Sequence, residues 1–264
     1  MNIKNNVNSL HTNFGSNYNS IYKKAIRSFS VKLNIFIFIC FFALNLNINK
    51  QKIKNDFIPD FKEKIYFDQY EVNKYNEIKT KLLSTNCSQM SENQREFLNG
   101  IIRKFRPQKI LEIGVCYGGS SIIILNAIND IIGSKLYSID LNSDKTVGEC
   151  VYKYFPHLLK NWYIFKGNVA TKFMKKIGNN IDMVFIDTAH FEPGEIMDFL
   201  IALPFLKEGA TVIIHDIGHQ INQGYYRNEW APYIIFNCIR GHKYLPSGNT
   251  ILKHEIGAVK MEKK

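Results

Sequence analysis

The sequence predicts an α/β protein built on a doubly wound, mostly parallel, seven-stranded sheet. Short apolar runs of strand length alternate with segments of helical length along residues 109–261, as in parallel sheets with right-handed crossovers. One apolar run, Ile110–Val115, gives way to a glycine-bearing turn, and Ser120 and Ser121 then lead into a second apolar run. A strand, a glycine turn and a helix in that order are typical of a nucleotide-type pocket at the mouth of a parallel sheet.

Length and composition indicate how large a core the chain can bury and which redox environment suits it. The chain has 264 residues, of which 45% are hydrophobic, so it can bury one sizeable core and carry an appendage. Its five cysteines contain no CxxC pair and are odd in number. We therefore expect neither a disulfide framework nor a zinc knuckle, and a reducing compartment fits best.

The formal net charge of +11 is unevenly distributed along the chain. Residues 1–54 contain eight basic residues and no acid, whereas the remainder has 26 basic against 23 acidic residues. The excess charge therefore bears on targeting or membrane contact through the tail, and no nucleic-acid partner is expected.

Within this basic tail, residues 33–48 form a short hydrophobic segment flanked by lysines. Its uninterrupted apolar centre, Ile35–Leu44, is shorter than the about 20 residues that span a bilayer. We interpret it as a marginal or interfacial membrane anchor with a transmembrane or surface-lying helix. A cleaved signal, a helix packed on the domain and a misassigned upstream start stay open. The folded domain after this tail is expected in the cytoplasm.

The elements follow in order after the tail. Residues 55–90 are expected to be a linker that becomes helical, and residues 91–264 to be the catalytic domain. The first clear helix is Ser91–Phe105, because Ser91 and Gln94 have the spacing of a capping box and the apolar residues fall on one face. The strands expected next are 110–115, 136–140, 162–166, 183–186, 211–214 and 256–261. Helices are expected over 146–154, 170–177 and 195–206, the last ending at Gly209. Residues 217–245, rich in aromatics and amides, are interpreted as a substrate-facing lid.

The turn after the first strand has residues suited to close backbone contact with a ligand. Gly114, Gly118 and Gly119 have no Cβ, so the chain can turn sharply there. Ser120 or Ser121 is expected to cap the next helix, leaving its positive end toward the pocket. Glu112 is a carboxylate within a buried strand and needs a partner. The alternative is a plain strand, turn and helix without a ligand.

Acids, amides or histidines follow five strands of the predicted sheet. These residues are Glu112, Asp140, Asn168, Asp187 with His190, and His215 with Asp216. Because parallel strands end at one edge, we expect them to converge. Asp140 closes the second strand and is placed to accept both hydroxyls of a ribose. Its alternative role is to cap a helix after Leu141.

These residues resemble class I S-adenosylmethionine-dependent methyltransferases, in the branch of small O-methyltransferases that includes cephalosporin-hydroxylase-like proteins. The resemblance runs from about Ser91 to Met261 and rests on SENQREFLNGII before LEIGVCYGGSS, on YSID, on VFIDTAHFEPGEIMDFLIALPFLKEGATVIIHD and on IGAV. It implies a Rossmann-like methyltransferase fold with an N-terminal helical and hydrophobic extension. In the general pattern a glycine stands in place of Cys116.

The resemblance also implies roles for individual residues. The cofactor would be held along its whole length, from the methionine part to the adenine. The residues that would hold it are Glu112, Gly114, Cys116, Tyr117, Gly118, Gly119, Ser120, Asp140, Leu141, Asn168 and Asp187. Asp140 would bind the ribose and Asn168 would lie near the adenine. Asp187 would face the reacting end.

A divalent cation is a second expectation from the resemblance, because many relatives bind one with acids after the fourth and fifth strands. Asp187 and Asp216 match those places, and His215 stands where relatives offer another acid or an asparagine. An all-oxygen site suits Mg²⁺, whereas a histidine ligand favours a transition metal such as Mn²⁺.

Three residues are candidates for the chemical step. His190, three residues after Asp187, is the expected general base on an acceptor hydroxyl. His215 is the rival base, and Asp187 faces the reaction. A histidine at a helix start also commonly bonds only to backbone.

The function that the sequence predicts is S-adenosylmethionine-dependent O-methylation of a small-molecule or sugar-like hydroxyl. One alternative is an NAD-type oxidoreductase, which the spacing of the glycines disfavours because it departs from GxGxxG. A second is a non-catalytic member of the fold that binds cofactor or metal, and a third is an RNA methyltransferase. Contact with a membrane through residues 33–48 and assembly as a homo-oligomer are left open.

Overall fold

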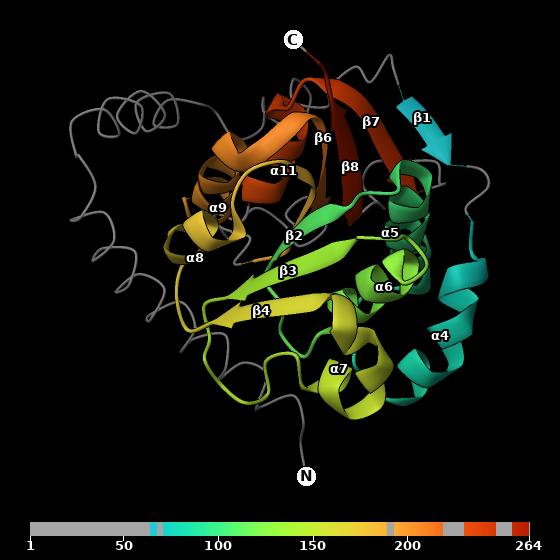
Figure 1. Cartoon of the computed structure of the whole chain (residues 1–264). Helices are drawn as coiled ribbons and strands as arrows, with labels where there is room; N and C mark the ends of the chain where they lie inside the picture. The colour runs from blue at the N-terminus through green and yellow to red at the C-terminus, as the bar shows by residue number, and fades with distance from the viewer. Residues whose placement is uncertain (1–63, 68–70, 189–192, 219–229, 247–254, 264) are drawn as a thin grey trace. The chain divides into compact units, whose positions relative to one another are not determined.

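The computed structural model describes residues 64–67, 71–188, 193–218, 230–246 and 255–263, all within the compact unit Lys62–Lys264. A central sheet has helices on both faces, with α4–α7 on one and α8, α9 and α11 on the other (Figure 1). Among the described helices, none is long and apolar enough to cross a bilayer. The anchor predicted at 33–48 lies outside the described residues.

The sheet has eight strands in the order β1-β7-β8-β6-β5-β2-β3-β4. The strands are β1 (Lys64–Phe67), β2 (Lys109–Ile113), β3 (Lys135–Asp140), β4 (Trp162–Lys166), β5 (Ile181–Ile186), β6 (Leu206–His215), β7 (Gly241–Pro246) and β8 (Ile256–Met261). β8 is antiparallel to both of its neighbours, and every other pair is parallel. The predicted doubly wound, mostly parallel sheet of seven strands is thus confirmed, and β1 adds an eighth strand at one edge.

The helices that the sequence predicted begin within about three residues of their predicted starts. They are α4 (Asn73–Ser84), α5 (Glu92–Phe105), α6 (Gly119–Ile128), α7 (Glu149–Tyr154), α8 (Thr171–Ile177), α9 (Gly194–Ala202) and α11 (Ala231–Cys238), with 3-10 turns η1 (Pro156–Asn161) and η2 (Leu203–Phe205). The capping box predicted before α5 is present, because Ser91 accepts from the Gln94 backbone and Gln94 accepts from the Ser91 backbone.

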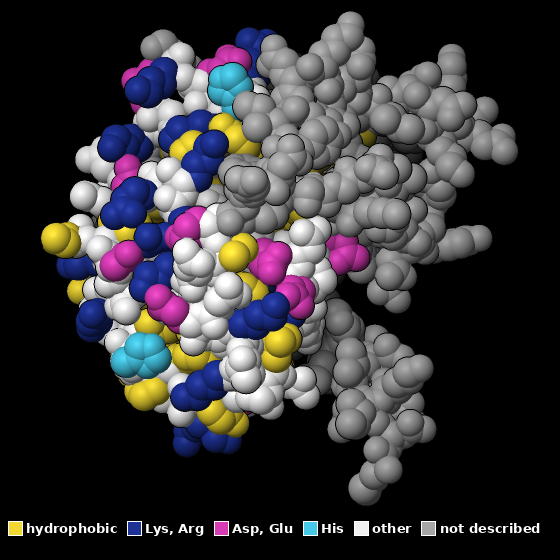
Figure 2. Space-filling model, turned by 90° about the vertical axis from the view of Figure 1, so that its right-hand side faces the viewer, with side chains coloured by type: hydrophobic (Ala, Val, Ile, Leu, Met, Phe, Trp, Pro, Cys, Tyr) yellow, Lys and Arg dark blue, Asp and Glu magenta, His cyan; other side chains and the backbone are white. Residues whose placement is uncertain are grey.

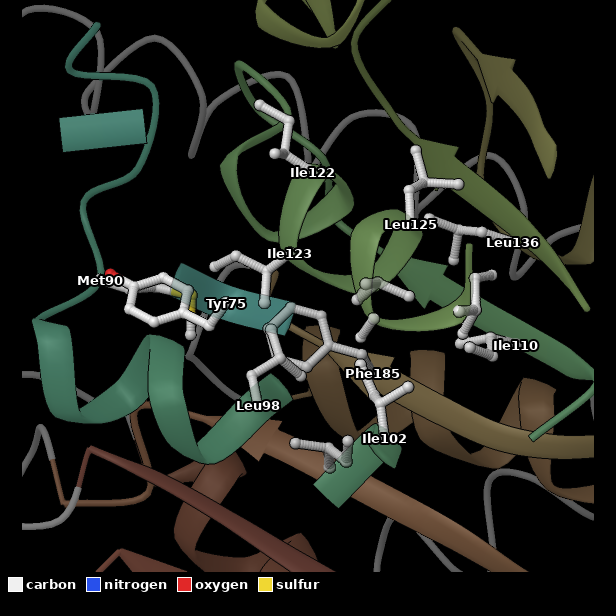
Figure 3. Packing of buried hydrophobic residues seen from close by; sticks show 14 of the residues in the cluster. Tyr75, Met90, Leu98, Ile102, Ile110, Ile122, Ile123, Leu125, Leu136 and Phe185 are labelled. Carbon is white, nitrogen blue, oxygen red and sulfur yellow. The ribbon is translucent and has the colours of Figure 1, made fainter. Parts of the chain in front are cut away.

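The main hydrophobic cluster lies between the sheet and α4–α6. Figure 3 shows Tyr75 of α4, Leu98 of α5 and Ile123 of α6 packed toward Phe185 of β5. Tyr75, Leu98 and Phe185 are fully buried. Although the sequence predicted only a linker becoming helical before residue 91, α4 is therefore an integral part of the domain core.

Two predicted elements differ from the structure in ways that have physical causes. The helix expected to run to Leu206 ends at Ala202, because Pro204 has no N–H to continue it and lies in η2. Gly209 does not end that helix but lies inside β6 with φ +69°.

The lid predicted over residues 217–245 is also wrong for the part that the structure describes. Residues 230–246 form α11 and β7, and their aromatic side chains Tyr233, Phe236 and Tyr244 are buried in the domain. Residues 219–229 lie outside the described residues.

Candidate functional site

The glycine turn after β2 brings three strand ends into direct contact. Gly114 has φ +93°, and a Cβ there would lie 1.8 Å from the carbonyl oxygen of Asp187 at the end of β5. The Gly114 N–H donates to Ile139 of β3, and the Asp187 N–H donates to Ile113 of β2. Only glycine fits this close approach, so the turn and the ends of β3 and β5 form one site.

Asp140 at the end of β3 binds the same turn through its carboxylate. Its Oδ2 accepts from the backbone N–H groups of Val115 and Cys116, both at 3.0 Å, and Oδ1 accepts from the Asn142 N–H at 2.8 Å. A carboxylate has about four acceptor positions, so about one is left for a ligand. Asp140 thus lies beside the turn, and its predicted contact with the ribose hydroxyls stays a prediction.

Glu112 lies inside the protein, next to the glycine turn. It is fully buried, and its carboxylate accepts from the hydroxyls of Ser120, Ser121 and Ser138 at 2.5–2.7 Å. Burial raises the pKa of Glu112 to about 7, although the three hydroxyl donors act to lower it. The side chain therefore joins α6 and β3 beneath the turn, and its predicted contact with a cofactor stays a prediction.

The N-cap of α6 is a different residue from the two serines that the sequence predicted. Gly118, with φ +94°, is the N-cap of α6, and no side chain caps that end. Ser120 and Ser121 lie inside the helix, and their hydroxyls turn inward to Glu112. The backbone N–H groups of Gly119, Ser120 and Ser121 have no hydrogen-bond partner among the described residues, as is usual in the first turn of a helix.

A second cluster forms where β5 and β6 end. His215 Nδ1 lies 3.4 Å from Asp187 Oδ1 and 3.3 Å from Asp216 Oδ2. Burial lowers the pKa of His215, but the carboxylates of Asp187 and Asp216 outweigh it and raise the pKa to about 10. This direction favours the imidazolium over the neutral imidazole. The role of His215 as the rival base stays a prediction.

Backbone strain marks this edge of the sheet. Asp216 has φ +56° and Cys116 has φ +49°, which non-glycine residues seldom adopt. Such strain persists where the surrounding structure holds it, often at functional sites. Here the Asp216 N–H is held by the Glu255 carbonyl before β8, and the Cys116 N–H by Asp140.

The remaining predicted site residues are arranged around these two clusters. Cys116 and Tyr117 are exposed on the turn, and Leu141 is half-buried after β3. Asn168 is exposed after β4, next to Gly167, whose N–H donates to the Asp140 carbonyl. His190 lies outside the described residues, so its role as a base stays a prediction.

Two features of the site were not found from the sequence. Cys87 and Cys150 form a disulfide across 63 residues, contrary to the expectation of reduced cysteines, and no local spacing signals such a pair. Ser138 links Glu112 to the indole of Trp162, which donates to its hydroxyl at 2.8 Å. A serine inside an apolar strand, in register beside Glu112, was the available signal.

Comparison with known proteins agrees with this geometry. Residues 111–217, which span the glycine turn, Asp140 and the β5 and β6 ends, match the family model of a methyltransferase domain. The chain contains a methyltransferase domain. We found no match among proteins of curated function.

Solved structures share the fold of this methyltransferase domain. An O-methyltransferase from Bacillus cereus, in complex with SAH, is 17% identical with a TM-score of 0.52, over 80% of this chain and 96% of that one. An O-methyltransferase from Streptomyces achromogenes involved in tomaymycin synthesis, in complex with SAM, is 18% identical with a TM-score of 0.51, over 72% and 90%. A methyltransferase from Geobacter sulfurreducens is 15% identical with a TM-score of 0.50, over 72% and 88%. At these identities the likeness shows the shared fold.

Proposed function

We propose that the domain transfers a methyl group from S-adenosylmethionine to a hydroxyl oxygen of a small-molecule or sugar-like acceptor. The observation that supports this most is the convergence of the glycine turn, Asp140 and Asp187 within the segment that matches a methyltransferase domain. The O-methyltransferases of the same fold, solved with SAH or SAM, support oxygen as the methyl acceptor.

The described residues suit the two ends of this cofactor. The free acceptor position of Asp140 suits a ribose hydroxyl. The unpaired N–H groups at the start of α6 suit a carboxylate such as that of the methionine part, because a helix N-terminus is positively polarised. Bound there, the cofactor would supply a methyl group on a positively charged sulfur. That sulfur is a good leaving group, because it departs as a neutral thioether.

The protein would add orientation and charge to that chemistry. Asp187, whose backbone carbonyl lies against Gly114, would orient the acceptor hydroxyl beside the turn. While no metal ion is bound, His215 as an imidazolium would hold the two carboxylates of the cluster in place. The acceptor of the hydroxyl proton that we propose is His190, as the sequence predicts.

Calorimetry of the full chain with S-adenosylhomocysteine, the product of methyl transfer, tests the cofactor site. We expect measurable binding that Asp140→Asn weakens about 10- to 100-fold, because a charge-assisted hydrogen bond and two anchors of the turn are changed. Asp144→Asn is the matched control, since Asp144 is an exposed acid on the same connection. Absence of binding, or equal loss in both variants, would contradict the assignment.

We further propose that Asp187, Asp216 and His215 bind a divalent cation, which would displace the proton from the ligating nitrogen of His215. Each residue offers one ligand atom, and these atoms lie within 4.8 Å of one another. Two carboxylates and one imidazole suit Mn²⁺ better than Mg²⁺, which prefers oxygen ligands. A cation there would help to orient the acceptor oxygen near Asp187.

Titration of the full chain with Mn²⁺, followed by electron paramagnetic resonance of the free ion, tests this site. We expect Asp216→Asn to weaken binding by more than about tenfold, because it removes one of three ligands. Asp144→Asn should bind as the natural protein does. Equal binding by both variants would place the ion elsewhere.

The charge of the described surface supports a small acceptor over a nucleic acid. Figure 2 shows basic and acidic side chains interspersed on the described part of one face, without a broad stretch of a single sign. Nucleic-acid binding usually needs a continuous basic surface. A cytoplasmic place for the domain, next to its cofactor, stays part of the proposal.

A further inference from the structure

The disulfide between Cys87 and Cys150 lies next to the glycine turn. Cys87 belongs to the irregular segment between α4 and α5, and Cys150 lies in the first turn of α7. The two residues are only 4% and 6% exposed. The bond therefore joins two segments that are distant in the sequence, inside the domain.

Each of these segments forms one wall against the turn. On the first side, a Cβ at Gly119 would lie 2.4 Å from the Cys87 carbonyl oxygen and 2.7 Å from Ser88 Cα. The glycine thus lets the Cys87–Ser88 backbone lie directly on the start of α6.

On the other side, the start of α7 holds the turn through its backbone. The Gly148 N–H donates to the Cys116 carbonyl at 2.7 Å, and the Cys150 N–H donates to the Tyr117 carbonyl at 3.1 Å. A Cβ at Gly118 would lie 2.8 Å from Val151 Cγ2. The turn therefore lies between residues 87–88 and 148–151, which the disulfide joins.

We propose that the Cys87–Cys150 bond positions the turn 116–119 for the cofactor, so that breaking the bond lowers cofactor affinity. The bond closes the two walls around residues 116–119. Without it, the irregular 87–88 segment is free to move away from Gly119, and the helix start loses one wall. A turn that must be ordered during binding binds more weakly than one already in place. This inference rests on the proposed function, because it assigns the turn to the cofactor.

The step is a thiol–disulfide exchange with a dithiol reductant. The S–S bond of the protein breaks, each of its sulfurs takes one proton, and the dithiol is oxidised to its own cyclic disulfide. In a reducing cytoplasm such a pair would exist partly as thiols, whereas the reverse exchange with a small-molecule disulfide, which is itself reduced to thiols, would restore the bond. The bond thus makes the affinity of the site sensitive to its redox environment.

The first experiment compares S-adenosylhomocysteine binding by the oxidised and the dithiothreitol-reduced full chain. Reduction is established by a gain of two titratable thiols per chain. We expect the dissociation constant to rise by about tenfold on reduction and to return on reoxidation. Failure of the two thiols to appear in the native protein would overturn the redox sensitivity.

Two variants distinguish the effect of the Cys87–Cys150 bond on cofactor affinity from the effects of other cysteines. Cys87→Ser combined with Cys150→Ser should bind as the reduced protein does and should not respond to dithiothreitol. Cys238→Ser changes a free, exposed cysteine at the end of α11 and should keep the full redox response. An oxidised-like affinity of the double variant would overturn the proposal.

Hydrogen exchange gives a readout that needs no ligand. On reduction we expect faster exchange in residues 114–122 and 146–151, with unchanged exchange in β5 and β6, whereas general destabilisation would affect all of them. Equal S-adenosylhomocysteine affinity in both redox states would overturn the proposal that the bond positions the turn for the cofactor, and would leave the proposed function intact. No binding in either state would overturn the proposed function, and the exchange data would still decide whether the bond orders the turn.

Discussion

Glu112 shows how one buried carboxylate fixes the local structure of the site. Its two oxygens take three serine hydroxyls, two from α6 and one from β3. These bonds fasten the start of α6 to the sheet just behind the turn. The carboxylate thereby orders the site through contacts within the protein.

The pKa of Glu112 makes a prediction about stability. Burial raises the pKa to about 7 from its ordinary value of 4.5, so the folded state holds a proton that the unfolded state releases between these values. The stabilisation is complete below about pH 4.5 and is lost as the pH rises through 7, by about 3 kcal/mol. Glu112→Gln should remove this part of the decline, so its free energy of unfolding should fall less between pH 5 and pH 8.

Urea unfolding at pH 5, 6, 7 and 8 measures the effect. Glu149→Gln serves as control, because it removes an exposed acid on α7 and should leave the profile unchanged. His215 also loses stabilising charge as the pH rises from 6.5 to about 10, and this part should persist in both variants. Parallel profiles for Glu112→Gln and the natural protein would refute the assignment.

At this same scale, the sequence predicted the positions of residues along the strands better than the partners of their side chains. It placed Asp140 and Asp187 at strand ends, and both lie against the turn. It also showed that Glu112 needed a partner, but residue type alone does not say whether that partner is a ligand or the protein. Only the positions of Ser120, Ser121 and Ser138 in the fold decide this.

At the scale of elements, strong local signals were predictive and ambiguous ones were not. The capping box at Ser91 and Gln94 fixed the start of α5, and the apolar runs fixed β4 and β8 to the residue. Serines near a helix start usually indicate a cap, yet here the glycine at 118 takes that position because the chain needs positive φ.

The elements that were missed depend on long-range packing. β1 is only four residues long and pairs with β7, which lies near the other end of the chain. The aromatics of 230–246 were interpreted as substrate-facing, whereas burial against the sheet explains them. Neither feature has a local pattern that distinguishes it from a loop.

At the scale of the whole molecule, residues far apart in sequence meet at the site. The Cys87–Cys150 bond is one such link, and the hydrogen bond from Gln94 Nε2 to Glu255 Oε2 at 2.7 Å is another, across 161 residues. Glu255 in turn accepts from the Asp216 N–H through its carbonyl. The start of α5 is thereby connected to the strained residue of the candidate cation site.

This link predicts a difference between two substitutions in one capping box. Ser91→Ala removes the cap but keeps the Gln94–Glu255 bond, whereas Gln94→Ala removes both the box and that bond. Both should lower the free energy of unfolding by about 1 kcal/mol. Only Gln94→Ala should loosen residue 255, so the Asp216 amide should exchange its hydrogen about fivefold faster, the equivalent of one hydrogen bond. Hydrogen exchange at Asp216 under native conditions measures this, and equal rates in the two variants would show that Gln94 acts only as a cap.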